Sequence, residues 1–205
     1  MIESATLHKV KPDYIILASS SPRRAELLAQ IGVPFHVHAV SLSEAPLARE
    51  APDALARRLA LAKARQAVAE TGAGAPVLAA DTVVALEGRS LGKPAGREDA
   101  LDMLERLSGR THEVYTAVAL IARGREQLAI SGSRVTMRST TAEERAAYWA
   151  TGEPADKAGA YAVQGRAAAF ISRLEGSYSG VMGLPLYETA EMLRSAGWTV
   201  FPGTA

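Results

Sequence analysis

One short segment near the beginning of the chain constrains the fold most, because it joins a buried strand to the start of a helix. Residues 14–18 form a continuous apolar run, Tyr-Ile-Ile-Leu-Ala, which predicts a buried β-strand. A serine loop follows at once, and its last residue, Ser21, is a favourable helix N-cap. Pro22 suits the first helical position, and apolar residues at helical spacing continue until Gly32 ends the helix. A strand, a short polar loop and a helix in this order predict an α/β protein.

The apolar pattern along the rest of the chain predicts further alternation of strands and helices. We expect strands at 35–40, 77–86, 114–122, 127–137 and 168–174. The third and fourth of these are expected to form a hairpin that turns near Gly124. We expect helices at 52–69, at 97–107, from a capping box at Thr141 to about Ala150, and from Pro185 to Gly197. Met1–Lys11 shows no periodicity and is predicted to be a loose leader before a single domain at 12–205.

Length and composition limit the classes of protein that the chain can belong to. Its 205 residues suit one domain, or one domain with two lobes, and 48% hydrophobic residues are enough to bury a core. The net charge is +1, from 23 basic and 22 acidic residues, which argues against a nucleic-acid partner but leaves room for a local basic pocket. The chain contains no cysteine, which excludes disulfides, thiolate nucleophiles and cysteine-based zinc sites.

The histidines argue against a zinc site, and the apolar stretches argue against a secreted or membrane-spanning protein. The four histidines lack the helical spacing of a zinc site: His8, His36, His38 and His112. The pair at 36 and 38 alternates along a predicted strand, and a solvated or hydrogen-bonded pair is favoured there. The beginning of the chain lacks the apolar run of a signal peptide, and no apolar stretch reaches membrane-spanning length. We therefore expect a soluble, cytoplasmic protein with no membrane partner.

The segment Ser19-Ser20-Ser21-Pro22-Arg23-Arg24 carries the strongest local sign of chemistry. It follows a predicted strand and opens a helix, where free backbone N–H groups and the helix dipole favour an anion. Its serine hydroxyls can donate hydrogen bonds, and its arginines suit bidentate phosphate recognition. A simple N-cap followed by two solvated arginines explains the segment equally well.

Asp81 is the second unusual residue, because it lies inside the apolar run 77–86. A carboxylate there is costly unless it is paired or bound to a metal. An aspartate at the end of a strand, hydrogen-bonded into a turn, is the alternative. We favour a metal ligand or general base, since ionised carboxylates suit magnesium or manganese.

Three other polar residues are ordinary when each is considered alone. Lys63 lies at the edge of the apolar face of the predicted helix 52–69, and a lysine that extends along the surface is its commoner explanation. Lys93 follows a glycine in a tight turn, where a solvated loop lysine is favoured. Glu44 is likewise unremarkable in its segment.

Two longer segments combine polar groups with small residues. Residues 156–165, Asp-Lys-Ala-Gly-Ala-Tyr-Ala-Val-Gln-Gly, are more typical of a binding loop than of a solvated linker. The polar stretch 109–116 leads into a predicted strand and either lines a cleft or forms a polar turn; the sequence favours neither.

Considered together, several of these segments resemble the Maf family, in the family's order and from about Tyr14 to Trp198. Any one of these segments alone is a weak indication of the family, but the set in this order is highly specific for it. The matching segments are Leu17-Ala-Ser-Ser-Ser-Pro-Arg-Arg24, Ala80-Asp-Thr82, Gly92-Lys-Pro94, Ser108-Gly-Arg-Thr-His112, Gly152-Glu-Pro-Ala-Asp-Lys-Ala-Gly-Ala-Tyr161 and Gly183-Leu-Pro-Leu186.

The resemblance implies an α/β fold with a mixed sheet, flanking helices and two lobes around a cleft, similar to the inosine triphosphate pyrophosphatases. It implies hydrolysis of a nucleoside triphosphate between the α- and β-phosphates with a divalent cation, Mg²⁺ or Mn²⁺. Asp81 corresponds to the family's proton acceptor, and with Glu44 it would bind the metal. The implied catalytic or phosphate-binding set is Ser19, Arg24, Glu44, Lys63, Asp81 and Lys93. The family's acidic stretch before Glu44 is only partly kept, because Ser41 and Ser43 stand where acidic residues are common, so that stretch supplies no further carboxylate ligand.

Within the resemblance, three positions indicate the branch that prefers dTTP and UTP over 7-methyl-GTP. That branch has an arginine after the Ser-Pro, a threonine after the aspartate and a glutamine in the Ala-Tyr loop, which Arg23, Thr82 and Gln164 match. The family has also been linked to septum formation, and a homodimer is compatible with the sequence. Two other classes remain open: a non-catalytic, nucleotide-sensing regulator of cell division, and a phosphatase that releases single phosphates.

Overall fold

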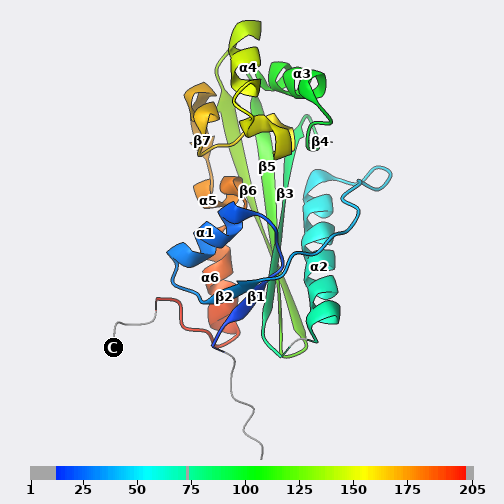
Figure 1. The fold of residues 1–205 in the computed structure, drawn as a ribbon, viewed down its shortest axis with the longest axis vertical. Helices are drawn as coiled ribbons and strands as arrows, with labels where there is room; N and C mark the ends of the chain where they lie inside the picture. The colour runs from blue at the N-terminus through cyan, green and yellow to red at the C-terminus, as the bar shows by residue number, and fades with distance from the viewer. Residues whose placement is uncertain (1–12, 73, 202–205) are drawn as a thin grey trace, which may run out of the picture.

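The fold is built on one long central strand, β3 (Val77–Leu86), in a computed structural model that describes residues 13–72 and 74–201 (Figure 1). Every β3 residue except Thr82 is buried, as expected for a continuous apolar run that is covered on both faces. The strand belongs to a seven-stranded sheet of order β2-β1-β3-β5-β6-β7, with β4 paired to one end of β3. The expected leader, Met1–Lys11, lies outside the described residues.

One side of the sheet is parallel and begins with the strand–loop–helix unit predicted above. β1 (Ile15–Leu17) pairs in parallel with both β2 (Phe35–Val37) and β3. Parallel neighbours need a crossover connection, and two helices provide it. These helices are α1 (Pro22–Gln30), between β1 and β2, and α2 (Pro52–Thr71), between β2 and β3. Both helices begin at a proline, as predicted.

The other side of the sheet is antiparallel. β5 (Thr111–Ala122) pairs with β3 and with β6 (Arg125–Met137), while β7 (Ile171–Glu175) pairs with β6 and β4 (Arg89–Leu91) with β3. The β5–β6 hairpin turns through Arg123 and Gly124, as predicted. Both have positive φ, 52° and 74°, and this geometry matches the right-handed twist of the two strands. The mixed sheet is therefore confirmed.

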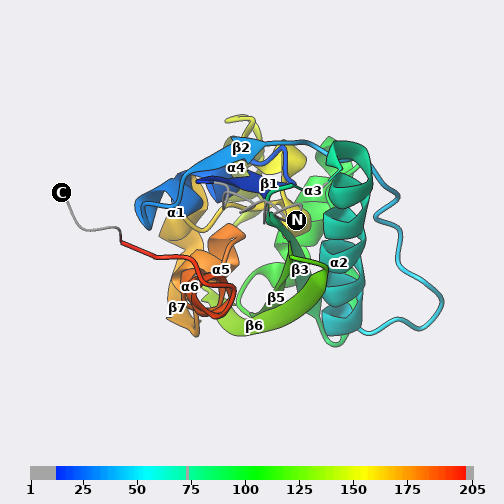
Figure 2. The same ribbon diagram turned by 90° about the horizontal axis from the view of Figure 1, so that it is seen from below.

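Helices cover both faces of the sheet to form the lower lobe (Figures 1 and 2). α2 covers one face, and α1, α5 (Tyr178–Met182) and α6 (Leu186–Ser195) lie on the other. The odd positions Val77 and Ala79 of β3 pack under α2, whereas the even positions Leu78 and Ala80 pack with α1 and α6. This alternation follows from the two-residue period of a strand.

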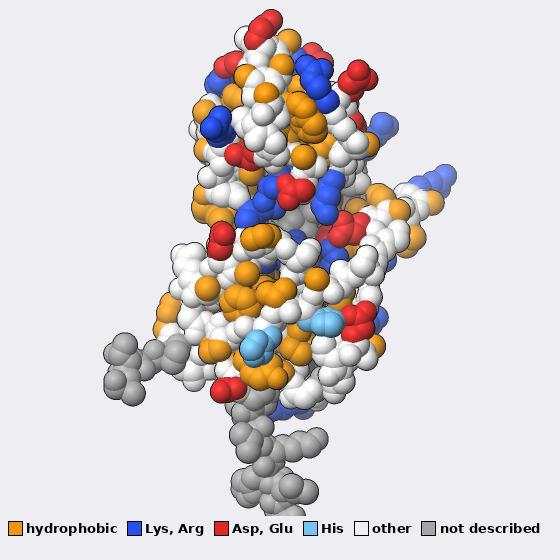
Figure 3. All heavy atoms as spheres, in the orientation of Figure 1, with side chains coloured by type: hydrophobic (Ala, Val, Ile, Leu, Met, Phe, Trp, Pro, Cys, Tyr) orange, Lys and Arg blue, Asp and Glu red, His pale blue; other side chains and the backbone are white. Residues whose placement is uncertain are grey.

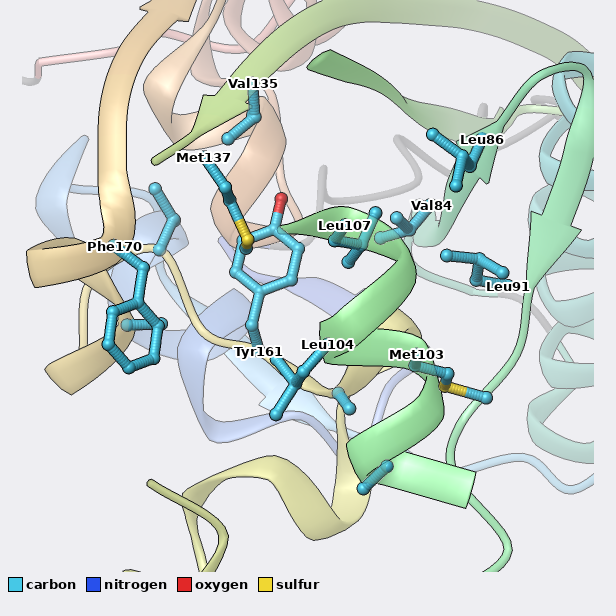
Figure 4. Close-up of a cluster of buried hydrophobic side chains, with 14 of the residues drawn as sticks. Val84, Leu86, Leu91, Met103, Leu104, Leu107, Val135, Met137, Tyr161 and Phe170 are labelled. Carbon is cyan, nitrogen blue, oxygen red and sulfur yellow. The ribbon is translucent and has the colours of Figure 1, made fainter. Parts of the chain in front are cut away.

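The upper lobe is built on the far ends of β3, β5 and β6. α3 (Arg97–Leu107), α4 (Ala142–Trp149) and three 3₁₀ turns, at Glu153–Asp156, Ala158–Ala160 and Arg166–Phe170, cover these ends. Figure 4 shows the apolar core that they share. It includes Leu86, Leu91, Met103, Leu104, Leu107, Val135, Met137, Tyr161 and Phe170. The capping box expected at Thr141 is present, with Glu144 completing it.

Several expectations require correction. β5 begins at Thr111, so the polar stretch 109–116 is mostly strand rather than turn. The strand expected at 168–174 is wrong in its first half, because Arg166–Phe170 forms a 3₁₀ turn and β7 begins only at Ile171. β2 ends at Val37, so His38 lies beyond the strand, where its Nε2 is 2.6 Å from Oε2 of Glu70. Within the described residues, no helix is long and apolar enough to cross a bilayer.

Candidate active site

A cleft of about 600 Å³ separates the two lobes, and it is lined by the residues that follow β1, the middle of β3, the start of α1, and loops from both lobes. Basic and acidic side chains gather in this hollow in Figure 3. The structure places all nine predicted site residues on its lining: Ser19, Arg23, Arg24, Glu44, Lys63, Asp81, Thr82, Lys93 and Gln164.

The serine loop turns the N-terminus of α1 toward the cleft. Ser19 is buried at the end of β1, and its Oγ accepts a hydrogen bond of 3.2 Å from the backbone N–H of Ser21. Ser21 is the N-cap residue, as predicted, but its side chain makes no capping hydrogen bond. Arg23 and Arg24 occupy the first turn of α1. Basic side chains and helix N–H groups here favour an anionic ligand.

Arg24 is held in place by neutral oxygen atoms. Its Nε donates to the carbonyl of Gly183 at 2.8 Å, and its guanidinium also donates to Oγ of Ser19 at 3.2 Å and to Oγ1 of Thr82 at 3.3 Å. Burial lowers the pKa of Arg24, while the nearby charge of Asp81 acts in the opposite direction. Because these three partners are uncharged, the arginine keeps its charge for an anion in the cleft.

A lysine joins two carboxylates on the α2 side of the sheet. Asp81 is an odd-numbered residue of β3, so its side chain points toward α2, where Lys63 meets it. The Nζ of Lys63 lies 2.6 Å from Oδ1 of Asp81 and 2.6 Å from Oε1 of Glu44. Lys63 is only 8% exposed, so a surface lysine, its commoner explanation in isolation, is wrong. Lys93 approaches from the turn after β4, with its Nζ 3.5 Å from Oε2 of Glu44.

The two carboxylates differ in their exposure and therefore in their acidity. Asp81 is 6% exposed, and burial raises its pKa even though Lys63 opposes the shift. The Glu44 side chain is 42% exposed. Partial burial raises the pKa of Glu44, but the hydrogen bond and charge of Lys63, together with Lys93, outweigh this and leave the pKa below its ordinary value. The buried carboxylate is thus the better proton acceptor of the two.

The carboxylates of the cleft suit a metal ion that also binds the phosphates of a substrate. Across residues 13–72 and 74–201, no group of three or more His, Cys, Asp or Glu side chains could hold a metal ion by itself. Magnesium, however, usually binds through one or two carboxylates and completes its shell with water and substrate phosphates. Glu44 and Asp81, which share one lysine, supply two such carboxylates.

The residues matched to the pyrimidine-preferring branch lie on different walls. Thr82 is an even-numbered residue of β3 and points away from Lys63. Its Oγ1 is 3.3 Å from Arg24 and 3.0 Å from Oγ1 of Thr116. Arg23 is half-buried in the first turn of α1, on the lower lobe. Gln164 is exposed and lines the cleft from the upper lobe.

The sequence did not identify every residue on the cleft. Asp156 and Lys157 also line it, and their position inside the glycine-rich binding loop was the signal that could have assigned them. Gly159 shows why that loop needs glycine. Its φ is 68°, and a Cβ there would lie 2.9 Å from Cγ1 of Val84. Its N–H donates to the carbonyl of Gly92 at 3.0 Å, which joins the binding loop to the turn that carries Lys93.

His112 is placed differently from either interpretation of its segment. It is fully buried on β5 in the upper lobe, and its Nε2 lies 2.8 Å from the hydroxyl of Tyr161. Tyr161 lines the cleft, so His112 supports the cleft from behind. Burial lowers the pKa of His112 to about 4.

Comparison with known proteins gives one consistent family. The family described as Maf-like protein matches residues 14–196. A dTTP/UTP pyrophosphatase from Methylococcus capsulatus is 54% identical over 183 residues, covering 89% of this chain and 91% of that protein. One from Methylobacillus flagellatus is 50% identical over 191 residues, covering 93% and 96%. One from Symbiobacterium thermophilum is 49% identical over 191 residues, covering 93% and 98%.

A solved structure also shows a distant likeness. It is a nucleoside-triphosphatase, dITP/XTP pyrophosphatase, from Mycobacterium abscessus, with a TM-score of 0.39 and 20% identity, covering 60% of this chain and 72% of that chain.

Proposed function

This chain belongs to the Maf family, and we propose that it hydrolyses dTTP and UTP to the monophosphate and pyrophosphate. The observation that carries the proposal is the meeting of Asp81, Lys63 and Glu44 beside the N-terminus of α1 in one cleft. The names of the similar proteins support the same reaction and the same substrates. We further propose that residues 12–205 act as one catalytic domain, since β3, β5 and β6 contribute to both lobes.

The charge of the cleft suits a triphosphate. Five basic side chains line it against three acidic ones: Arg23, Arg24, Lys63, Lys93 and Lys157 against Glu44, Asp81 and Asp156. An excess of positive charge in a concave, partly closed site attracts an anion and holds it more strongly than it would in open water. The near-neutral whole chain thus carries a local basic pocket.

The residues of the cleft would have different roles in the reaction. Ser19, Arg24 and the N–H groups at the start of α1 would hold phosphate oxygens, with Lys63 and Lys93 offsetting charge that develops as the bond breaks. Water would attack the α-phosphorus, and the bridging bond to the β-phosphate would break. Asp81 would accept the proton of the water, because its pKa is raised and it lies at the base of the cleft. Pyrophosphate would then leave.

A divalent cation fits this arrangement, and Glu44 and Asp81 would hold it. When bound with the phosphates, such an ion offsets their charge and lowers the pKa of water. Lys63 contacts both carboxylates and would turn its ammonium toward the phosphates when the substrate enters. Mg²⁺ and Mn²⁺ both suit carboxylate oxygens.

Recognition of the base would come from the upper wall. The Gln164 amide both donates and accepts hydrogen bonds, and the pairing edge of uracil or thymine presents acceptor, donor and acceptor. Arg23 would lie near the base or pack beside it. Thr82 already contacts Arg24 and Thr116, so we assign it to supporting Arg24 as well as to completing the pocket.

Product analysis in labelled water tests the proposal. With UTP, Mg²⁺ and H₂¹⁸O, we expect UMP and pyrophosphate, with the label in UMP because water attacks the α-phosphorus. Excess chelator should abolish turnover. Orthophosphate as the first product would instead indicate a phosphatase, full activity in chelator would exclude the metal, and no turnover would favour a nucleotide-sensing regulator.

A further inference from the structure

The loop between β2 and α2 carries Glu44 to the active site, although it has little regular structure. Residues 38–51 contain neither helix nor strand, and most of them are exposed. An exposed loop of this length is usually mobile unless something holds it. Yet Glu44 must reach Lys63, which is buried on α2, to take part in the reaction proposed above. The contacts that hold this loop therefore bear on catalysis.

The loop runs along α2 in the direction opposite to the helix. Near its beginning, the carbonyl of Ser41 accepts a hydrogen bond of 3.2 Å from Nε2 of Gln66. In its middle, Glu44 meets Lys63. One residue later, the carbonyl of Ala45 accepts a hydrogen bond of 3.1 Å from Nη2 of Arg58. As the loop numbers rise, the helix numbers fall, so Glu44 lies between two backbone attachments to the same helix.

Arg58 also fixes the end of the loop through a second residue. Its Nε and Nη2 donate to the two carboxylate oxygens of Glu50 at 2.6 Å and 2.8 Å, a paired geometry that only arginine offers. The Glu50 side chain is 8% exposed, and its Oε2 accepts the N–H of Leu47 at 2.9 Å. Arg58 thus holds the backbone on both sides of Pro46, a residue that lines the cleft.

We propose that Arg58 is a positioning residue for the reaction, which holds segment 44–47 so that the Glu44 carboxylate reaches Lys63 and, through it, Asp81. This inference rests on the proposed function, because it assigns Arg58 a role in that same reaction. Arg58 touches no reacting atom in this scheme. It acts by fixing the backbone next to Glu44, and a displacement of a carboxylate by about 1 Å is enough to matter in catalysis.

A double-mutant cycle tests the inference, with Arg58→Gln and Glu44→Gln singly and together. We expect Arg58→Gln to lower kcat by about 10–100-fold, the usual cost of losing a residue that orients a ligand. In the Glu44→Gln background the same substitution should change kcat less than about threefold, because there is no longer a carboxylate to position. Arg57→Gln is the matched control, since Arg57 is the neighbouring residue on α2 and pairs with Asp53 of the same helix.

Hydrogen exchange supplies a reading that does not depend on activity. Arg58→Gln should speed exchange at the N–H group of Leu47, because its acceptor Glu50 is held by Arg58, and leave the amides in the middle of α2 unchanged, whereas Arg57→Gln should alter neither. Arg58→Lys keeps the charge beside Glu50 but has one nitrogen in place of the two that meet the Glu50 oxygens, so it loses the paired contact and should give a smaller change of the same kind. It serves if Arg58→Gln does not fold.

Three results would overturn the inference. These are an equal fall in kcat in both backgrounds, unchanged loop exchange in both Arg58 variants, or a wild-type rate in Arg58→Gln while Glu44→Gln is impaired. Failure of the proposed function is distinguishable, because the wild-type chain itself would then release no pyrophosphate from UTP.

Discussion

The lower wall of the cleft carries its polar and charged groups on regular elements, whereas the upper wall presents them on loops and turns. Asp81 lies in the middle of a ten-residue strand, and Lys63 lies on a twenty-residue helix; both are buried. Gln164 and Lys93 are exposed, on a loop and on a turn. Groups on strands and helices are held more precisely than groups on loops. The difference suggests that the lower wall, together with Lys93, performs the phosphate chemistry, while Gln164 on the upper wall selects the base.

Glu44 is the exception that refines this comparison. It belongs to the lower lobe but comes from a loop. It reaches Lys63 and Asp81 only because α2 holds the loop beside it. A site residue on a loop can therefore be as well placed as one on a strand, provided that a helix supplies the attachments.

The largest expected effect comes from a substitution on the lower wall, at Asp81. Asp81→Asn keeps the size of the side chain but removes its charge, so it removes the proposed proton acceptor and the proposed metal ligand together. We expect kcat on UTP to fall about 10²–10⁴-fold with the fold intact. Steady-state kinetics and circular dichroism would measure both. A variant that kept more than about a third of the wild-type rate would show that Asp81 is structural and that the lower wall does not perform the chemistry.

A second prediction concerns the stability of the upper lobe. The pKa of His112 is lowered to about 4, below its ordinary value of 6.5, because burial disfavours the charged ring. Above pH 6.5 the ring is neutral in both the folded and the unfolded chain. As the pH falls from 6.5 toward 4, only the unfolded chain takes up the proton, so stability is lost. The loss from this group approaches about 3 kcal/mol at pH 4.

Urea unfolding of the wild type and His112→Gln at pH 7, 6 and 5 would isolate this effect. We expect the variant to be less stable at pH 7, because it disturbs the contact with Tyr161, but to lose less stability on acidification. Groups elsewhere titrate alike in both chains and cancel in the difference. Parallel pH curves for the two chains would mean that His112 is not the group that titrates.

The sequence pattern identified Asp81 on its central strand better than it identified the contacts that join the elements of the site. Asp81 was recognisable because a carboxylate inside an apolar run has few inexpensive explanations. Lys63 was not, since its burial depends on the packing of α2 against β3, and helical spacing alone placed it at the edge of the apolar face. The attachment of Ala45 to Arg58 joins a loop carbonyl to a helix side chain, which leaves no periodic trace.

In the fold, too, elements that depend on local sequence were predicted well, and elements that depend on tertiary contacts were not. The strand at 77–86 and the helix at 97–107 were predicted to the residue, because periodicity and flanking residues determine them locally. Residues 168–170 were expected to begin a strand but belong to the 3₁₀ turn Arg166–Phe170, in which Glu153 accepts hydrogen bonds from the N–H groups of Arg166 and Ala167. Such a tertiary contact overrides local propensity. The short helix α5 contains a glycine and gives no periodic signal.

The smallest effect is expected at the upper wall, where substitution should change the preference between substrates more than the chemistry. Cytosine replaces the ring donor and one carbonyl of uracil with groups of the opposite type, so a site built on hydrogen bonds leaves polar groups unpaired when CTP binds. Gln164→Leu removes the amide and keeps much of its volume, and Gln164→Glu keeps only acceptors at neutral pH. Both should lower kcat/KM on UTP and dTTP by about 10–100-fold, the range of one to three kcal/mol for lost hydrogen bonds to a substrate. Residual activity on CTP and GTP should change far less. Steady-state kinetics on the four triphosphates would decide the matter. An equal fall on every substrate would place Gln164 at the phosphates, beside the lower wall and Lys93, and an unchanged rate on all four would remove it from the site.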